Sequence, residues 1–212
     1  MRPIGFMIAA ALIASNSAAA SWKEYPQPQL GFVVEFPADP VASMGNYKTG
    51  LVQSATAHIY SVKEEHAVYA ATVVDFLDRK EEGAILLSEA ESMLTQLGDV
   101  TSFTPQRVEP GRAAIYGHFI TLNCRSGHVT DQLGQTAASV RAWLKDMSGA
   151  ECPDGSRLMA NVFFNRGRLY MIMGINLPST EDAAASPSAL RFSNSISFFA
   201  ADGTRNFADT FR

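Results

Sequence analysis

Short strand-like runs that follow one another across tight turns are the feature of this chain that most constrains its fold. The clearest pair covers residues 157–165 and 168–177, where bulky apolar side chains fill both runs. Asn165-Arg166-Gly167 makes the turn between them, and glycine permits the backbone to reverse there. A connection this short joins antiparallel neighbours, because parallel strands need a crossover of a dozen residues or more. The pair therefore predicts a β-hairpin.

A second pair of runs has the same arrangement. Residues 51–62 and 67–76 are rich in β-branched residues and tyrosine, and only the charged tetrapeptide 63–66 separates them. The run 67–76, AVYAATVVDF, is apolar on both faces. A strand of this kind is covered on both sides, so we expect it near the centre of the sheet.

Two further stretches complete the expected strands. Gly31–Pro40, GFVVEFPADP, predicts a strand over residues 32–36 that the prolines stop, after an extended lead-in over residues 21–30. Residues 100–108 and 113–123 form a third strand pair, joined through the turn-forming dipeptide Pro110-Gly111.

Three segments have the signature of helices. Ser88 and Glu91 have capping-box spacing, and Gly98 is a stop signal for the helix that should follow Ser88. A second helix is expected over residues 137–147. A third begins with Ser186 as the cap before Pro187, and its expected buried stripe is Ala189, Leu190, Phe192 and Ile196. Helices placed between hairpins predict an α+β fold: an antiparallel β-sheet built from hairpins, with helices packed on its faces.

Residues 1–20 have the layout of a secretory signal peptide. Arg2 precedes an apolar run, and small residues end in Ala18-Ala19-Ala20, which predicts cleavage between Ala20 and Ser21. A membrane anchor is the alternative, but a spanning helix needs about 20 apolar residues and the run is shorter. We expect an exported protein, periplasmic or extracellular. Its layout would be one domain over residues 21–200, with an insertion at 125–154 and a loosely ordered tail at 201–212.

The sequence contains two cysteines, Cys124 and Cys152, which bracket the least regular part of the expected domain. In an oxidising compartment such a pair usually forms a disulfide. Two independent buried thiols are the alternative. Export favours the bridge, so we predict an intramolecular disulfide that pins the insertion at its base.

Charge and motifs argue against several function classes. The formal net charge is −4 and no basic cluster occurs, whereas nucleic-acid binding needs a positive face. The chain has no G-x-S-x-G elbow, phosphate-binding glycine loop, C-x-x-C or H-E-x-x-H motif. His58 and His118 could approach each other across the sheet, although isolated structural histidines are the simpler interpretation. We expect no catalytic, cofactor-binding or metal-binding residues and no membrane span in the mature chain.

Four motifs carry a family resemblance. They are W-x-x-Y at residues 22–25, G-F-x-V-x-F-P at 31–37, F-F-x-x-G-R-L-Y at 163–170 and S-F-F at 197–199. With these motifs the chain resembles the superfamily of the photosystem II extrinsic protein P (PsbP-like proteins) and its small exported bacterial relatives. The resemblance covers roughly residues 22–199, apart from the segment between the cysteines, which departs from the family pattern. It implies an antiparallel sheet with helices on its faces, and a role in binding or stabilising other macromolecules. It supplies no shared catalytic motif.

The leading functional hypothesis is therefore an exported, non-enzymatic binding or accessory domain whose partner is another protein of unknown identity. One alternative is a carrier that holds a small apolar ligand between sheet and helix, with Phe163, Phe164 and Tyr170 in the pocket wall. We expect those three side chains to form core instead, because large apolar residues on paired strands are normally buried. The other alternative is an enzyme whose site is assembled from residues distant in sequence.

Overall fold

The computed structural model describes residues 21–108, 114–125, 137–178, 187–200 and 203. Its centre is a seven-stranded antiparallel sheet with the strand order β3-β4-β5-β9-β8-β7-β6. The strands are β3 (Val41–Tyr47), β4 (Ala55–Lys63), β5 (Ala67–Asp75), β6 (Gly98–Val108), β7 (Ile115–Cys124), β8 (Arg157–Asn165) and β9 (Arg168–Asn176). The predicted α+β fold and the antiparallel sheet are thus confirmed.

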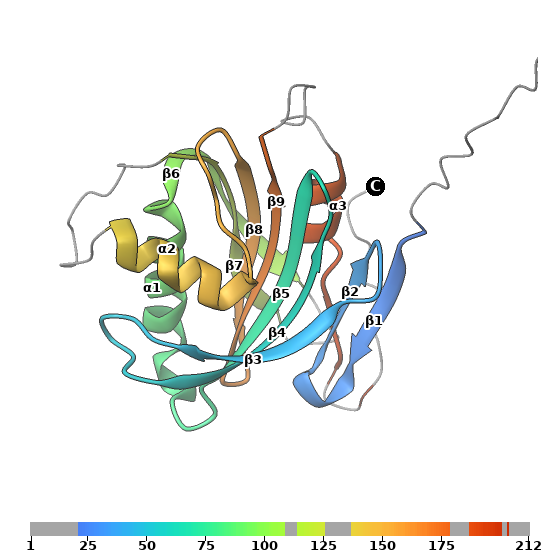
Figure 1. The fold of residues 1–212 in the computed structure, drawn as a ribbon. Helices are drawn as coiled ribbons and strands as arrows, with labels where there is room; N and C mark the ends of the chain where they lie inside the picture. Colours follow the sequence, from blue (N-terminus) through green and yellow to red (C-terminus); the bar gives the residue numbers. More distant parts are fainter. Residues whose placement is uncertain (1–20, 109–113, 126–136, 179–186, 201–202, 204–212) are drawn as a thin grey trace, which may run out of the picture.

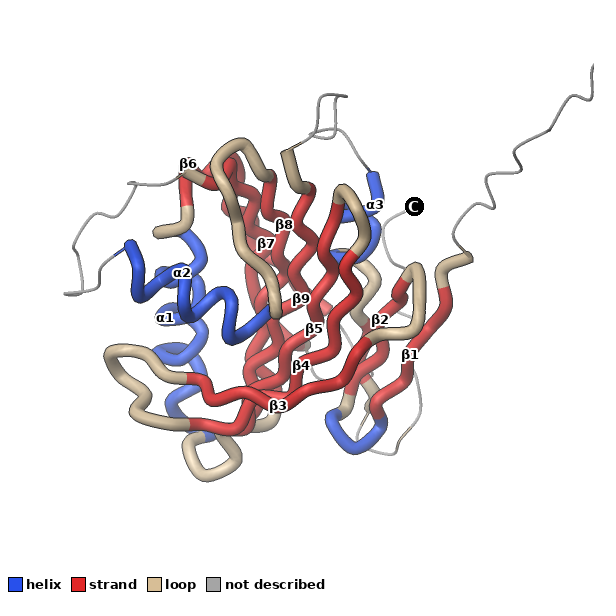
Figure 2. Tube along the Cα trace, viewed as in Figure 1, coloured by secondary structure: helices blue, strands red, loops and turns tan. Residues whose placement is uncertain are grey.

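The sheet lies between two different layers (Figures 1 and 2). Helices α1 (Gly83–Thr95) and α2 (Ala137–Ser148) cover one face. The other face carries helix α3 (Pro187–Ser193) and a three-stranded sheet of β1 (Lys23–Gln27), β2 (Phe32–Phe36) and β10 (Ser197–Phe198). Each layer encloses its own hydrophobic core, which we call the helix-side core and the β2-side core. Because both faces of the central strands are buried, these strands are predominantly apolar.

The β8–β9 hairpin shows how local sequence determines the sheet. Asn165 pairs with Arg168, and the two turn residues, Arg166 and Gly167, have φ angles of 52° and 79°. Two successive left-handed residues define the type I′ turn that matches the twist of paired strands. The predicted hairpin is confirmed. Phe163 and Tyr170, from its two strands, are buried in the β2-side core as expected, and Phe164 packs against the helix-side core.

Strand β5 occupies the centre that its apolar pattern predicts. It pairs with β4 on one side and with β9 on the other, and all its residues except Asp75 are buried. The predicted strand at residues 32–36 also forms, as β2. It begins after a short 3-10 turn, η1 (Pro28–Leu30), where Gly31 adopts a left-handed φ of 80°.

The two most exposed strands were not predicted. The lead-in contains β1, which tolerates Pro26 because β1 is an edge strand. Strand β3 is the other omission, since its residues are mostly exposed and show no alternation of apolar and polar side chains. The strand predicted over residues 51–62 forms as β4, but it starts at Ala55.

The capping-box prediction for the first helix is wrong. Helix α1 begins at Gly83, so Ser88 and Glu91 lie inside it, and it ends at Thr95, before Gly98 opens strand β6. Burial explains the earlier start, because a helix beginning at Gly83 brings Leu86 into the helix-side core together with Ala90, Met93 and Leu94. Packing of an apolar stripe outweighs a single cap.

The second helix matches its prediction, and the third matches in part. Helix α2 spans Ala137–Ser148, and α3 begins at Pro187, while the proposed cap Ser186 lies outside the described residues. Ala189 and Phe192 are fully buried, but Leu190 is 42% exposed, so its place in the stripe is wrong. The helix ends at Ser193, and Ile196 reaches the β2-side core from the segment that follows.

Candidate functional site

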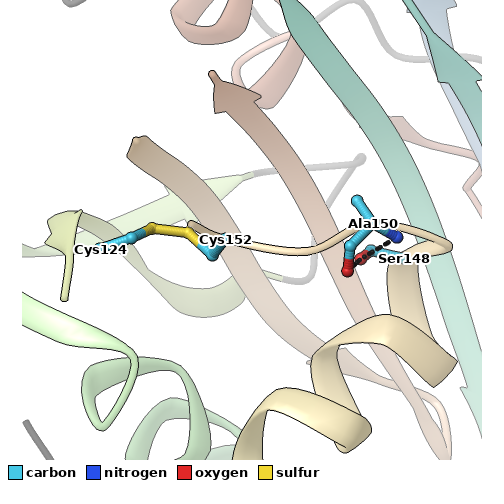
Figure 3. Close-up of a disulfide and its surroundings, with 4 residues drawn as sticks. All are labelled: Cys124, Ser148, Ala150 and Cys152. Atoms are coloured by element: carbon cyan, nitrogen blue, oxygen red, sulfur yellow. Dashed lines mark hydrogen bonds between the residues drawn. A yellow bond between two sulfur atoms is a disulfide. The ribbon is translucent and has the colours of Figure 1, made fainter. Parts of the chain in front are cut away.

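The two cysteines lie together, as the sequence indicated (Figure 3). Cys124 is the last residue of β7, and Cys152 follows α2; their Cα atoms are 5.7 Å apart, a disulfide distance, and both side chains are buried. Hydrogen bonds reinforce the junction: the Cys124 N–H donates to the Ser156 carbonyl at 2.8 Å, and the Gly155 N–H donates to the Cys124 carbonyl at 3.3 Å. The residues just before β8 therefore lie beside the end of β7.

The segment between α2 and Cys152 is held by Ser148. Its hydroxyl donates to the Leu144 carbonyl at 2.7 Å. The same hydroxyl accepts the Ala150 N–H at 3.1 Å (Figure 3). Ser148 and Ala150 are both buried. The helix end and the cysteine pair thus form one ordered structural unit, which fits an anchoring role.

A half-buried polar cluster joins β4, β5 and β9. Asp75 accepts from the Arg168 Nε at 2.8 Å and lies 3.1 Å from the His58 Nε2. Burial alone would raise the pKa of Asp75, but the hydrogen bonds and positive charge of Arg168 and His58 outweigh it, so the pKa is lowered. Arg168 also donates to the Gln29 carbonyl at 3.0 Å. The cluster therefore ties the central sheet to the η1 turn.

A second imidazole–carboxylate pair joins β7 to α1. The His118 Nδ1 lies 2.5 Å from the Glu91 Oε1, and the His118 ring stacks on Phe103 with centroids 4.6 Å apart. Burial raises the pKa of Glu91, and the hydrogen bond with His118 opposes that rise without cancelling it. This pair was not visible in the sequence, because Glu91 was assigned to a helix cap.

The structure does not bring the two strand histidines together. His58 is on β4 and His118 is on β7, and the strands β5, β9 and β8 lie between them. A carboxylate beside an imidazole is half of a general-base arrangement. In the described part of the chain, neither imidazole hydrogen-bonds to a hydroxyl or thiol side chain. No group of three or more metal-binding side chains occurs among the described residues.

Exposed apolar side chains gather on the outermost strands at one end of the sheet. We define the β6–β7 surface as Val100 and Phe103 of β6 with Tyr116 of β7; these side chains are 43%, 46% and 63% exposed. The Arg107 guanidinium lies 5.8 Å from the Tyr116 ring centroid, which is within cation–π range. Two aromatic rings and two basic side chains, Arg107 and His118, thus lie side by side on neighbouring strands.

Two shallow grooves flank Lys145 near the end of α2. One, of about 450 Å³, is lined by Arg141, Cys152 and neighbouring residues; the other, of about 530 Å³, lies between α2 and β3. The Lys145 ammonium pairs with Glu151 at 2.9 Å. At the second groove a Cβ on Gly45 would lie 2.9 Å from Ile59 Cδ1 and 3.2 Å from the Asp146 carbonyl, so glycine permits the close approach of α2.

The remaining predicted site lies at the boundary of the described chain. Ala20 is outside the described residues and Ser21 is the first residue within them, so cleavage between the two stays a prediction. Within the described ranges, no helix is long and apolar enough to cross a membrane. Comparison with known proteins gives no assignment: no protein-family model matches the chain, and no curated protein matches it significantly.

Proposed function

We propose that this chain is an exported, non-enzymatic binding domain and that its partner is another protein, which docks on the β6–β7 surface. The observation that carries the proposal is the exposure of Phe103 and Tyr116 on adjacent strands, outside either core. Tyrosine, phenylalanine and arginine are enriched in protein–protein interfaces, and Arg107 lies beside Tyr116. Contact with a partner would remove these rings from water.

The position of the surface in the sheet supports the same interpretation. Strand β6 pairs only with β7 among the described strands, so within the described part of the chain its other edge is unpaired. Open edges recruit other chains, but Pro105 lacks an N–H and interrupts the row of donors in β6. We therefore infer that the partner contacts the side chains of the β6–β7 surface and does not extend the sheet by a long added strand.

Export and family membership belong to the same proposal. Cysteines at disulfide distance are compatible with an oxidising compartment, and the layout of residues 1–20 supports secretion. We propose a relationship to the superfamily of the photosystem II extrinsic protein P from the motifs at residues 31–37 and 163–170, which form β2 and the β8–β9 hairpin. The N-terminus of the secreted protein tests export: mass spectrometry should find Ser21.

Site-specific cross-linking tests the binding proposal. A photo-reactive phenylalanine analogue placed at position 116 should give a discrete higher-mass product in the exported fraction of the source cell. Position 44 is the matched control, because Met44 is 70% exposed but lies on β3, at the opposite end of the sheet. A product at both positions, or at neither, would contradict a binding site on the β6–β7 surface.

A further inference from the structure

Three buried polar atoms in the helix-side core have no hydrogen-bond partner among the described residues. They are the Tyr47 hydroxyl, the Glu89 Oε2 and the Trp143 Nε1. The three side chains are at most 5% exposed and come from β3, α1 and α2. Native proteins rarely leave such groups unpaired, because each lost hydrogen bond to water must be replaced.

Two of the three side chains are in ring contact, and the third is hydrogen-bonded to the loop that follows β3. The Tyr47 ring packs edge-on against the Trp143 ring, with centroids 6.1 Å apart and planes at 76°. Burial and then the negative charge of Glu89 raise the pKa of Tyr47. The other Glu89 oxygen, Oε1, is occupied, since it accepts the Leu51 N–H at 2.8 Å.

The donor and acceptor inventory defines the group that would satisfy all three atoms. An indole N–H can only donate, a carboxylate oxygen can only accept, and a phenol can do both. A hydroxyl group matches this set, because it accepts from Trp143 and donates to Glu89. A cation fits poorly, since the indole N–H directs positive charge toward it.

We infer that Tyr47, Glu89 and Trp143 form an internal site that binds one hydroxyl group, supplied either by a water molecule or by a small alcohol. Buried waters in globular proteins typically make about three hydrogen bonds to polar groups of this kind. The site is independent of the β6–β7 surface and does not depend on the proposed function. The β3–β4 loop is attached to α1 by the Leu51–Glu89 hydrogen bond.

Nuclear magnetic resonance tests the site through the indole proton of Trp143. The chain has two tryptophans, and Trp22 is an internal control because its ring packs on Tyr69 in the β2-side layer. We expect an Overhauser effect between the Trp143 indole proton and a long-lived water. On titration with isopropanol, replacement of that signal by one to the isopropanol methyl protons identifies an alcohol site. A signal that isopropanol leaves unchanged identifies a water site.

Two isosteric variants decide whether these residues build the site. Tyr47→Phe removes one of the three polar atoms and should abolish the Overhauser effect at Trp143. Tyr170→Phe is the matched control: Tyr170 is equally buried, but its hydroxyl donates to the Leu30 carbonyl in the other core, so the signal should persist. The inference is overturned if Trp143 shows no effect with water or isopropanol, or if the effect survives Tyr47→Phe unchanged.

Discussion

Replacing both cysteines by alanine should lower the free energy of unfolding by about 3.5 kcal/mol. The magnitude follows from the sequence separation of 28 residues between Cys124 and Cys152, through the loop entropy that a cross-link removes from the unfolded chain. Alanine is preferred to serine, because both positions are buried and serine would place hydroxyl groups there. For a domain with a total stability of about 5–15 kcal/mol, such a loss is large.

Urea unfolding of the oxidised protein, the reduced protein and the Cys124→Ala/Cys152→Ala variant measures the effect. Thiol titration of the denatured, unreduced protein comes first and should find no free thiol. The reduced protein and the variant should then lose similar stability, which corresponds to a decrease in melting temperature of about 7–14 °C at about 2–4 °C per kcal/mol. Two free thiols would refute the bond. An oxidised protein no more stable than its reduced form would refute the anchoring argument.

Two further perturbations probe the polar cluster and the β2-side core. Asp75→Asn should destabilise the protein at neutral pH: because the folded-state pKa of Asp75 is lowered, its contribution is present above the unfolded pKa and is lost as pH falls through the folded pKa. Urea midpoints of wild type and variant should therefore converge in acid, and a gap that is constant with pH would contradict the assigned role. Phe192→Ala should lower the free energy of unfolding by about 3–5 kcal/mol. The Phe192 ring is buried, and its centroid lies 4.8 Å from that of Phe36 and 5.3 Å from that of Tyr69. The control is Leu190→Ala, in the same helix but 42% exposed, and it should change the free energy of unfolding by no more than about 0.5 kcal/mol. Equal losses of stability for the two variants would show that the assigned orientation of α3 is wrong.

Local chemistry accounts for the features that the sequence predicted well. The β8–β9 hairpin depends on neighbouring residues and on a turn at Arg166-Gly167, so its signal is contained in one short window. Strand β5 is apolar on both faces because both of its faces are covered, and the same pattern predicted its central position. The cysteine pair could be matched because the chain contains only two cysteines.

Edge strands and the first residues of helices were harder to predict from the sequence, for a physical reason. Strands β1 and β3 are mostly exposed, so their side chains need no apolar alternation, and their backbones are held by partners already in place. The start of α1 was decided by how many apolar residues the sheet could bury. The Ser88–Glu91 spacing is compatible with a cap, but it contains no information on the burial of Leu86, which depends on the packing of α1 against the sheet.

Tertiary structure alone decided which polar groups meet. Asp75 and Arg168 face each other because β5 and β9, far apart in sequence, are neighbours in the sheet, whereas His58 and His118 are kept apart by three intervening strands. The Glu91–His118 pair and the Tyr47–Trp143 contact likewise form only where helices pack on the sheet. The central strands and the hairpins are encoded by short-range patterns, and the cysteine pair follows from the presence of only two cysteines in the sequence. Strand order and the polar clusters depend on contacts between distant residues, which no local pattern records.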